Sequence, residues 1–155
     1  METPKYIFDS SIFITLQRRY PPDVYESLWE IIDKLIKEGI VVSSEEVFDE
    51  IKIGNDVLVE WAKKNKYAFI QSDEKIQNTV KQILKNNEKL VLGSKKTNGA
   101  DPFVVALAII NSCKVVTEET KNGEDNPPKI PNVCNSYGVK YLSFVDFLRE
   151  LQIKI

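Results

Sequence analysis

The stretch Gly99–Glu119, GADPFVVALAIINSCKVVTEE, decides the fold of this chain. It predicts a turn, a helix and a short strand in quick succession. Asp101 is placed to cap the helix, and the proline after it suits a first helical position, where its missing N–H costs nothing. Residues 103–110 are almost all apolar, so we expect a helix that is buried on most sides. The strand that follows ends in two acids, Glu118 and Glu119.

Short apolar strands alternate with helical segments along the whole chain. The strands are expected at residues 5–8, 40–42, 67–70, 114–117 and 139–141. Helix starts are expected at Ser10 or Ser11, at Asp23, at the pairs 43–44 and 72–73, and at Ser143. This alternation predicts an α/β fold: a three-layer α/β/α sandwich around a five-stranded, mainly parallel sheet, in one domain over residues 1–155.

Composition limits the function classes. The 155 residues are 43% hydrophobic and 28% charged, as in an ordinary soluble globular protein. No apolar run approaches the ~18 residues that cross a bilayer, and the first residues lack a secretory signal, so we expect a cytoplasmic protein. In that reducing compartment, Cys113 and Cys134 are expected to be small core residues and not a disulfide.

Histidine is absent, which excludes Ser-His and Cys-His nucleophile pairs and a histidine general base. Two cysteines are too few for the common structural zinc sites. Chemistry at neutral pH would then depend on carboxylates, lysines or a hard metal ion bound by oxygens. With a net charge of −2, nucleic-acid binding would need a local basic patch or metal ions.

Acidic residues follow the first and fourth predicted strands. Asp9 ends the first strand as Glu118–Glu119 end the fourth, so these acids share one crevice if the two strands are neighbours where the strand order reverses. Asp101 and Glu50 can turn into the same crevice from their helices. Four carboxylates would repel one another unless cations neutralise them, and Mg²⁺ or Mn²⁺ is the natural choice. Taken singly, each acid also has an ordinary explanation as a helix cap, a loop acid or a solvated residue.

Four motifs in this order resemble the PIN-domain nucleases, best known as VapC-type toxins. The motifs are FDSS, SSEEVFDEI, GADPFVVALA and VVTEE. Matched residue by residue, the acids of the family fall on Asp9, Glu50, Asp101 and Glu119. The fourth acid is Glu where the family has Asp, which shifts its carboxylate by about one methylene. Two alternatives stay open, namely Glu118 in place of Glu119, and Asp49 in place of Glu50 if the register is off by one.

The likeness covers the whole chain and is closer to a PIN-like bacterial and archaeal subfamily of unknown function. That subfamily shares the GADPFV helix, the VVTEE strand end and a later segment, KIPNVC, here Lys129–Cys134. No chemistry for this last segment follows from its residues. It is explained by a helix cap and core packing, and it can also shape the site or hold a partner.

The resemblance implies a single PIN-like domain with metal-dependent endoribonuclease activity, acting as the toxin of a toxin–antitoxin pair. In this hydrolase, Asp9, Asp101 and Glu119 would bind Mg²⁺ or Mn²⁺, and Glu50 would bind metal or position the attacking water. The alternative is a catalytically weak or inactive PIN-fold module that binds RNA or protein. A phosphatase with Asp9 as nucleophile is disfavoured, because Ser11 stands where that chemistry needs a second acid.

Partners follow from the same resemblance. Single-stranded or looped RNA is the expected target, with Lys95 and Lys96 favoured as substrate-binding residues because they precede Asp101. The basic runs at 18–19 and 63–66 are further candidates, and a solvated surface also explains each of them. A toxin needs a cognate antitoxin. Apolar residues of the second helix, for example Tyr25 and Leu28, could serve that contact or a homodimer, and the sequence does not separate these uses from ordinary core packing. No membrane partner is expected.

Overall fold

The computed structural model describes residues 3–53, 56–87, 99–120 and 129–155. Lys95 and Lys96, predicted to bind substrate, lie outside these residues. Within the described ranges, none of the helices combines the length and apolar character that a membrane span requires.

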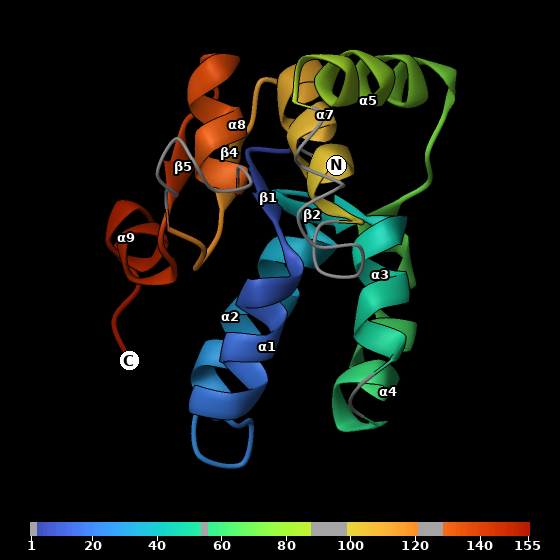
Figure 1. Ribbon diagram of the computed structural model, residues 1–155. Helices are drawn as coiled ribbons and strands as arrows, with labels where there is room; N and C mark the ends of the chain where they lie inside the picture. Colours follow the sequence, from blue (N-terminus) through green and yellow to red (C-terminus); the bar gives the residue numbers. More distant parts are fainter. Residues whose placement is uncertain (1–2, 54–55, 88–98, 121–128) are drawn as a thin grey trace.

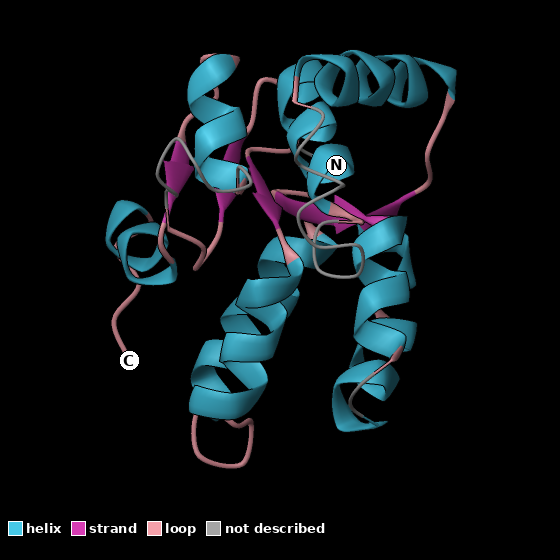
Figure 2. Cartoon of the chain, viewed as in Figure 1, coloured by secondary structure: helices cyan, strands magenta, loops and turns pink. Residues whose placement is uncertain are grey.

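A single five-stranded sheet runs through the molecule, with helices on both sides of it (Figures 1 and 2). The strands are β1 (Tyr6–Phe8), β2 (Val41–Ser44), β3 (Phe69–Ile70), β4 (Lys114–Val116) and β5 (Tyr141–Leu142). Their order is β3-β2-β1-β4-β5, and every neighbouring pair is parallel. The predicted α/β sandwich is confirmed. Because β1 and β4 are neighbours where the strand order reverses, the crevice predicted for acids lies at their carboxyl ends.

The helices connect these strands and cover the sheet. Their bounds are α1 Ser10–Arg19, α2 Glu26–Lys37, α3 Glu45–Lys52, α4 Asp56–Lys64, the 3₁₀ turn η1 Lys66–Ala68, α5 Glu74–Asn86, α7 Asp101–Asn111, α8 Ile130–Ser136 and α9 Phe144–Glu150. In Figure 1, the pairs α1–α2 and α3–α4 both extend from the edge of the sheet where β1 ends.

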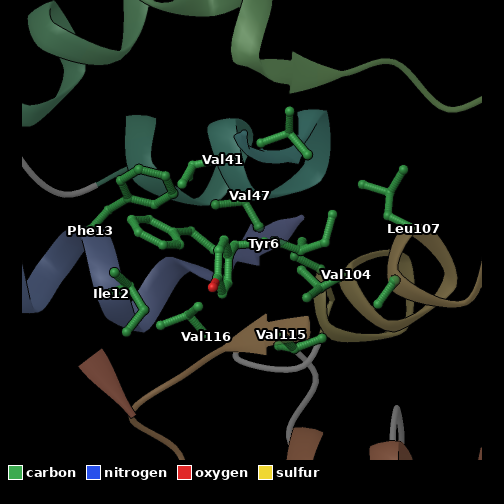
Figure 3. Packing of buried hydrophobic residues seen from close by; sticks show 14 of the residues in the cluster. Tyr6, Ile12, Phe13, Val41, Val47, Val104, Leu107, Val115 and Val116 are labelled. Carbon is green, nitrogen blue, oxygen red and sulfur yellow. The ribbon is translucent and has the colours of Figure 1, made fainter. Parts of the chain in front are cut away.

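Helix α7 is the central helix of the fold. It packs against β1, β2 and β4 and against α5 on its other side. Its side chains from Val104 to Ala108 are all buried, as predicted from their apolar character. Figure 3 shows Val104 and Leu107 of α7 in one packed cluster with Val115 of β4 and with the phenyl ring of Phe13 on α1. The first residue of α7 is therefore fixed by a well-packed helix.

Asp101 does not cap α7, contrary to the prediction. The helix begins one residue earlier, with Ala100 as the N-cap, because the N–H groups of Phe103 and Val104 both donate to the Ala100 carbonyl (3.0 and 3.1 Å). No side chain caps this helix end. The carboxylate of Asp101 is therefore not used by the first turn of the helix.

The other helix starts follow the predicted capping residues with two exceptions. Ser44, Asp73 and Ser143 each accept a hydrogen bond from the first turn of their helix. Helix α1, however, is capped by Asp9 and not by Ser10 or Ser11, since Asp9 Oδ1 accepts from Ile12 N (3.2 Å). Helix α2 starts at Glu26 and not near Asp23, because residues 21–25 form a turn closed by the Pro21 carbonyl.

The predicted apolar docking residues of the second helix are part of the core. Leu28 is fully buried, and Tyr25 packs edge-on against Tyr20, with ring centroids 5.1 Å apart. Of the uses left open by the sequence, Leu28 therefore has the ordinary core role, and Tyr25 is half-buried against the core. Leu28 is not available as a docking residue, because α2 packs against β2. Cys113 and Cys134 are buried free thiols, as predicted.

Candidate active site

Four acids from four separate elements gather where β1 and β4 end. Asp9 follows β1, Glu119 lies just beyond β4, Asp101 begins α7, and Glu50 lies on the last turn of α3. Asp9 and Asp101 are only 1% and 2% exposed. The charges of Glu119, Asp9 and Glu50 all act on Asp101 and raise its pKa, so the four carboxyl groups are close neighbours. We refer to these four residues as the acidic cluster.

Asp9 is fixed in place by hydrogen bonds to both of its carboxylate oxygens. Oδ1 accepts from Ser11 Oγ (2.5 Å) and from Ile12 N (3.2 Å), and Oδ2 accepts from Thr117 Oγ1 (2.6 Å). Burial raises the pKa of Asp9 to about 7, although these hydrogen bonds oppose the rise, and the charge of Glu119 adds to it. Asp9 therefore joins β1 to the start of α1 and to the end of β4.

The two hydroxyls that hold Asp9 are themselves oriented by the backbone after β4. Ser11 Oγ accepts from Glu118 N, and Thr117 Oγ1 accepts from Glu119 N, both at 3.0 Å. Each hydroxyl can therefore direct its own proton at Asp9. Ser11 was expected only as a helix cap, and no role was predicted for Thr117. The available signal was their place in the FDSS and VVTEE motifs, where Ser11 lies two residues after Asp9 and Thr117 lies two residues before Glu119.

Asp101 and Glu119 form the most tightly linked pair of the cluster, joined by a side-chain hydrogen bond. Burial raises the pKa of Asp101 to about 9, and the charges of Glu119, Asp9 and Glu50 add to the rise. Burial also raises the pKa of Glu119, opposed by a hydrogen bond from Ile130 N (3.4 Å) and by the charge of Lys129. Burial and the neighbouring charges thus favour a proton on this linked pair at neutral pH.

Glu50, and not its neighbour Asp49, faces the cluster. Burial raises the pKa of Glu50 to about 7, the charge of Glu119 adds to the rise, and a hydrogen bond with Ser10 lowers it. Asp49 instead points to solvent and forms an ion pair with Lys52 (3.2 Å). Of the two registers left open by the sequence, the structure places Glu50 with the other acids.

Glu118 is turned away from the cluster and supports α9. Its Oε1 accepts a hydrogen bond from Phe144 N (2.8 Å), the first backbone N–H of that helix. The adjacent Glu119 faces Asp101, because successive residues beyond a strand point to opposite sides. Of the two candidates for the fourth acid, only Glu119 lies in the cluster.

A divalent cation suits the chemistry of this donor set. Glu50 Oε1 and Asp101 Oδ2 are buried oxygens without a hydrogen-bond partner, and carboxylate oxygens are the ligands that Mg²⁺ and Mn²⁺ prefer. In the described part of the chain, however, no three acid, cysteine or histidine side chains are already arranged to hold a metal ion. The raised pKa of Asp101 is consistent with a cluster that holds no cation, because a proton on this carboxyl group reduces the repulsion among the acids. A cation would have to replace that proton and draw the oxygens closer.

The segment Lys129–Cys134 lies against the cluster. Its first residues contact Glu119 through Ile130 N and the Lys129 charge. The Cys134 thiol is fully buried, and its pKa rises to about 12 through burial and the charges of Asp9, Asp101 and Glu119. This thiol therefore stays protonated and packs beneath the acids. The segment thus helps to shape the site, one of the two roles left open by the sequence.

Comparison with known proteins places this chain in a family. The family described as a domain of unknown function, DUF4411, matches residues 6–155. The chain belongs to the DUF4411 family. No curated protein matches it. Among solved structures, it is similar to a chain of VapBC2 from Rickettsia felis, determined bound to a DNA fragment from the promoter of that pair. The TM-score is 0.53 at 16% identity, over 90% of this chain and 98% of the other.

That likeness concerns the fold. The DUF4411 chain shares the α/β fold of a chain of that VapBC2 complex. The roles of the four acids in this DUF4411 protein rest on their own geometry.

Proposed function

We propose that this protein is a divalent-cation-dependent endoribonuclease and the toxin of a toxin–antitoxin pair. The observation that supports it best is the convergence of Asp9, Glu50, Asp101 and Glu119 from four separate elements into one buried cluster. Burying four carboxyl groups together opposes folding, and a fold tolerates that cost where the acids bind a cation and its substrate. The PIN-like fold shared with a VapBC complex supports the same conclusion.

The residues have distinct tasks in this proposal. Asp9, Asp101 and Glu119 would hold Mg²⁺ or Mn²⁺, which supplies charge neutralisation at the phosphodiester and lowers the pKa of a bound water. Ser11 and Thr117 keep Asp9 oriented through its two oxygens. Glu50, whose pKa of about 7 lies near the working pH, accepts a proton from the attacking water or adds a further cation ligand.

RNA with unpaired nucleotides is the favoured substrate. Asp9 and Asp101 are buried at the starts of α1 and α7, and Glu50 of α3 is half-buried beside them, a position that the phosphates of a regular duplex do not easily reach. The basic runs at 18–19 and 63–66 are exposed and available to steer a polyanion. As the toxin of a pair, the protein would need an antitoxin to cover this crevice.

A cleavage assay tests the proposal. Purified protein is incubated with total cellular RNA in Mg²⁺, Mn²⁺ or EDTA, beside the isosteric variants Asp101→Asn and Asp23→Asn. Asp23 is an exposed turn residue and serves as the matched control. We expect wild type and Asp23→Asn to cut RNA only with a cation, and Asp101→Asn to be at least roughly 100-fold slower. Equal cleavage by Asp101→Asn, or cleavage in EDTA, would overturn the proposal.

One observation favours a second candidate, a PIN-fold module that binds RNA or protein without catalysis. No three side chains in the described part of the chain are arranged to hold a metal ion, and the fourth acid is the longer Glu119. Mn²⁺ affinity separates the two candidates. A nuclease must bind Mn²⁺ through the cluster, whereas an inactive module need not.

A further inference from the structure

A second hollow lies on the far side of α3 from the acidic cluster. This groove has a volume of about 790 Å³ and is formed by α3, η1 and the end of β3. Its aromatic residues are Phe48, Tyr67 and Phe69, and its polar residues include Glu45, Lys66 and Gln71. We refer to it as the α3–β3 groove. None of its residues takes part in the cluster described above, so its chemistry is so far unassigned.

The groove combines an aromatic floor with one free aromatic ring. Phe48 is 7% exposed and is covered by the Nζ atoms of Lys52 and Lys66, at 5.2 and 5.7 Å from the ring centroid. Tyr67 is 56% exposed, and its hydroxyl donates to Asn65 Oδ1 (3.3 Å), while no ring contact with another aromatic side chain is present in the described part of the chain. The face of the Tyr67 ring is therefore available to a flat, aromatic partner.

The charges around this floor balance. Glu45 and Asp49 oppose Lys52 and Lys66, and Asp49 already pairs with Lys52 at 3.2 Å. A phosphate group is disfavoured in this groove, because it would face the carboxylates of Glu45 and Asp49. An uncharged heterocycle that carries both hydrogen-bond donors and acceptors suits the mixture, because Glu45 can accept from an amine and Gln71 can donate and accept. This is the chemistry of a nucleobase edge.

The groove and the acidic cluster lie on two sides of the same helix. Helix α3 contacts α1, whose N-terminal cap is Asp9, and it also contacts β3. Asp49 and Glu50 are adjacent on α3, so one faces the groove and the other the cluster. Because the strands are parallel, the end of β3 and the end of β1 open on the same edge of the sheet. One RNA strand that crosses α3 can thus reach both places.

We propose that the α3–β3 groove binds one unpaired nucleobase of the RNA strand that is cut at the acidic cluster, with Tyr67 as the stacking platform. The inference rests on the proposed ribonuclease function and adds a specificity site to it. Glu45 accepts a hydrogen bond from an amine of the base edge and Gln71 donates or accepts one, which gives the site a preference among bases. A base held there fixes which phosphodiester of a looped RNA reaches the cluster.

Binding of single-stranded RNA tests the inference separately from cleavage. The full chain carrying Asp101→Asn is titrated in Mg²⁺ with labelled oligomers of roughly eight nucleotides, each of one base type. Tyr67→Ala is added to remove the ring, Tyr67→Phe to keep it, and Tyr141→Ala to remove a tyrosine of the opposite sheet edge that is 37% exposed. We expect Tyr67→Ala to weaken binding about 5- to 100-fold, and the two controls to stay within about twofold.

An oligomer with one abasic position completes the test. The abasic oligomer should bind the parent more weakly by the same factor that Tyr67→Ala produces with the intact oligomer. The two changes combined should weaken binding no further, because both remove the same stacked pair. If Tyr67→Ala binds RNA as tightly as its parent does, the proposal that the α3–β3 groove binds a base is wrong. Cleavage of RNA by wild type would still support the proposed ribonuclease function. If the parent binds no RNA, the inference falls. If Tyr67→Ala instead loses only a protein partner, the groove is a protein-docking surface and the inference is wrong.

Discussion

Replacing Asp101 with Asn should stabilise the cation-free protein, and more so at high pH. Burial and three neighbouring acids raise the pKa of Asp101 from 3.8 to about 9, so the folded chain retains a proton that the unfolded chain loses above pH 4. A raised pKa means that stability is full at low pH and is lost as the pH rises toward 9. The isosteric amide of Asn needs no proton, so it removes this loss.

The size of this stability gain can be worked out by comparing the unfolding free energy at two pH values. Each pH unit above 3.8 costs about 1.4 kcal/mol while the folded protein holds the proton. Between pH 5 and pH 8 the loss due to Asp101 is therefore about 4 kcal/mol at most, and side-chain relaxation and water entry reduce it. We expect the stability gained by Asp101→Asn to be about 2 to 4 kcal/mol larger at pH 8 than at pH 5.

Urea unfolding in EDTA at the two pH values measures this directly, with Asp23→Asn as the matched control. Comparing two pH values cancels any constant effect of the amide on packing or hydrogen bonding. A gain that is the same at both pH values, or a destabilisation that grows with pH, would refute the raised pKa of Asp101 that burial and the neighbouring acids produce. Adding Mn²⁺ should reverse the ranking, because only wild type keeps the carboxylate that binds it.

Three further changes separate the roles of neighbouring residues. Glu119→Gln should weaken Mn²⁺ binding at least roughly tenfold by calorimetry, whereas Glu118→Gln should only lower the unfolding free energy by at most about 1 kcal/mol, because its amide oxygen still accepts from Phe144 N, without the charge of the carboxylate; the opposite pattern would reassign the fourth acid. Thr117→Val should lower Mn²⁺ affinity about 10- to 100-fold, since Asp9 Oδ2 loses its donor, and an unchanged titration would show that this hydroxyl does not position Asp9. Leu28→Ala should cost about 2 to 5 kcal/mol in urea unfolding, and a cost near zero would mean that this residue is not in the core.

The fold could be predicted because each of its elements has a local signal. Apolar strands alternate with amphipathic helices, and Ser44, Asp73 and Ser143 supply side-chain caps where they were expected. The pairing of β1 with β4 is a long-range property. No residue of either strand signals it, so the pairing could be stated only as the condition under which the acids of the two strand ends would meet.

The acids of the candidate site could be predicted from the sequence, but the arrangement of their side chains could not. Position on a strand end could not tell Glu118 from Glu119, since the choice depends on which one α9 engages. Asp101 was predicted to be the cap of α7, because the start of a helix is uncertain by one residue from sequence. That one residue decides whether the Asp101 carboxylate caps the helix or points into the acidic cluster. Thr117 was missed as a partner of Asp9, since their hydrogen bond joins residues 108 positions apart in the chain. Ser11 lies only two positions from Asp9 and was interpreted as a helix cap, because a serine shortly after a strand also suits that role.

Mn²⁺ binding followed by electron paramagnetic resonance tests the central claim most directly. The claim is that Asp9, Glu50, Asp101 and Glu119 together form a divalent-cation centre. We predict that wild type and Asp23→Asn bind Mn²⁺, that Asp9→Asn and Asp101→Asn each lose most of that binding, and that all four proteins stay folded. Equal Mn²⁺ binding by wild type and Asp101→Asn, or none by wild type, would contradict the account.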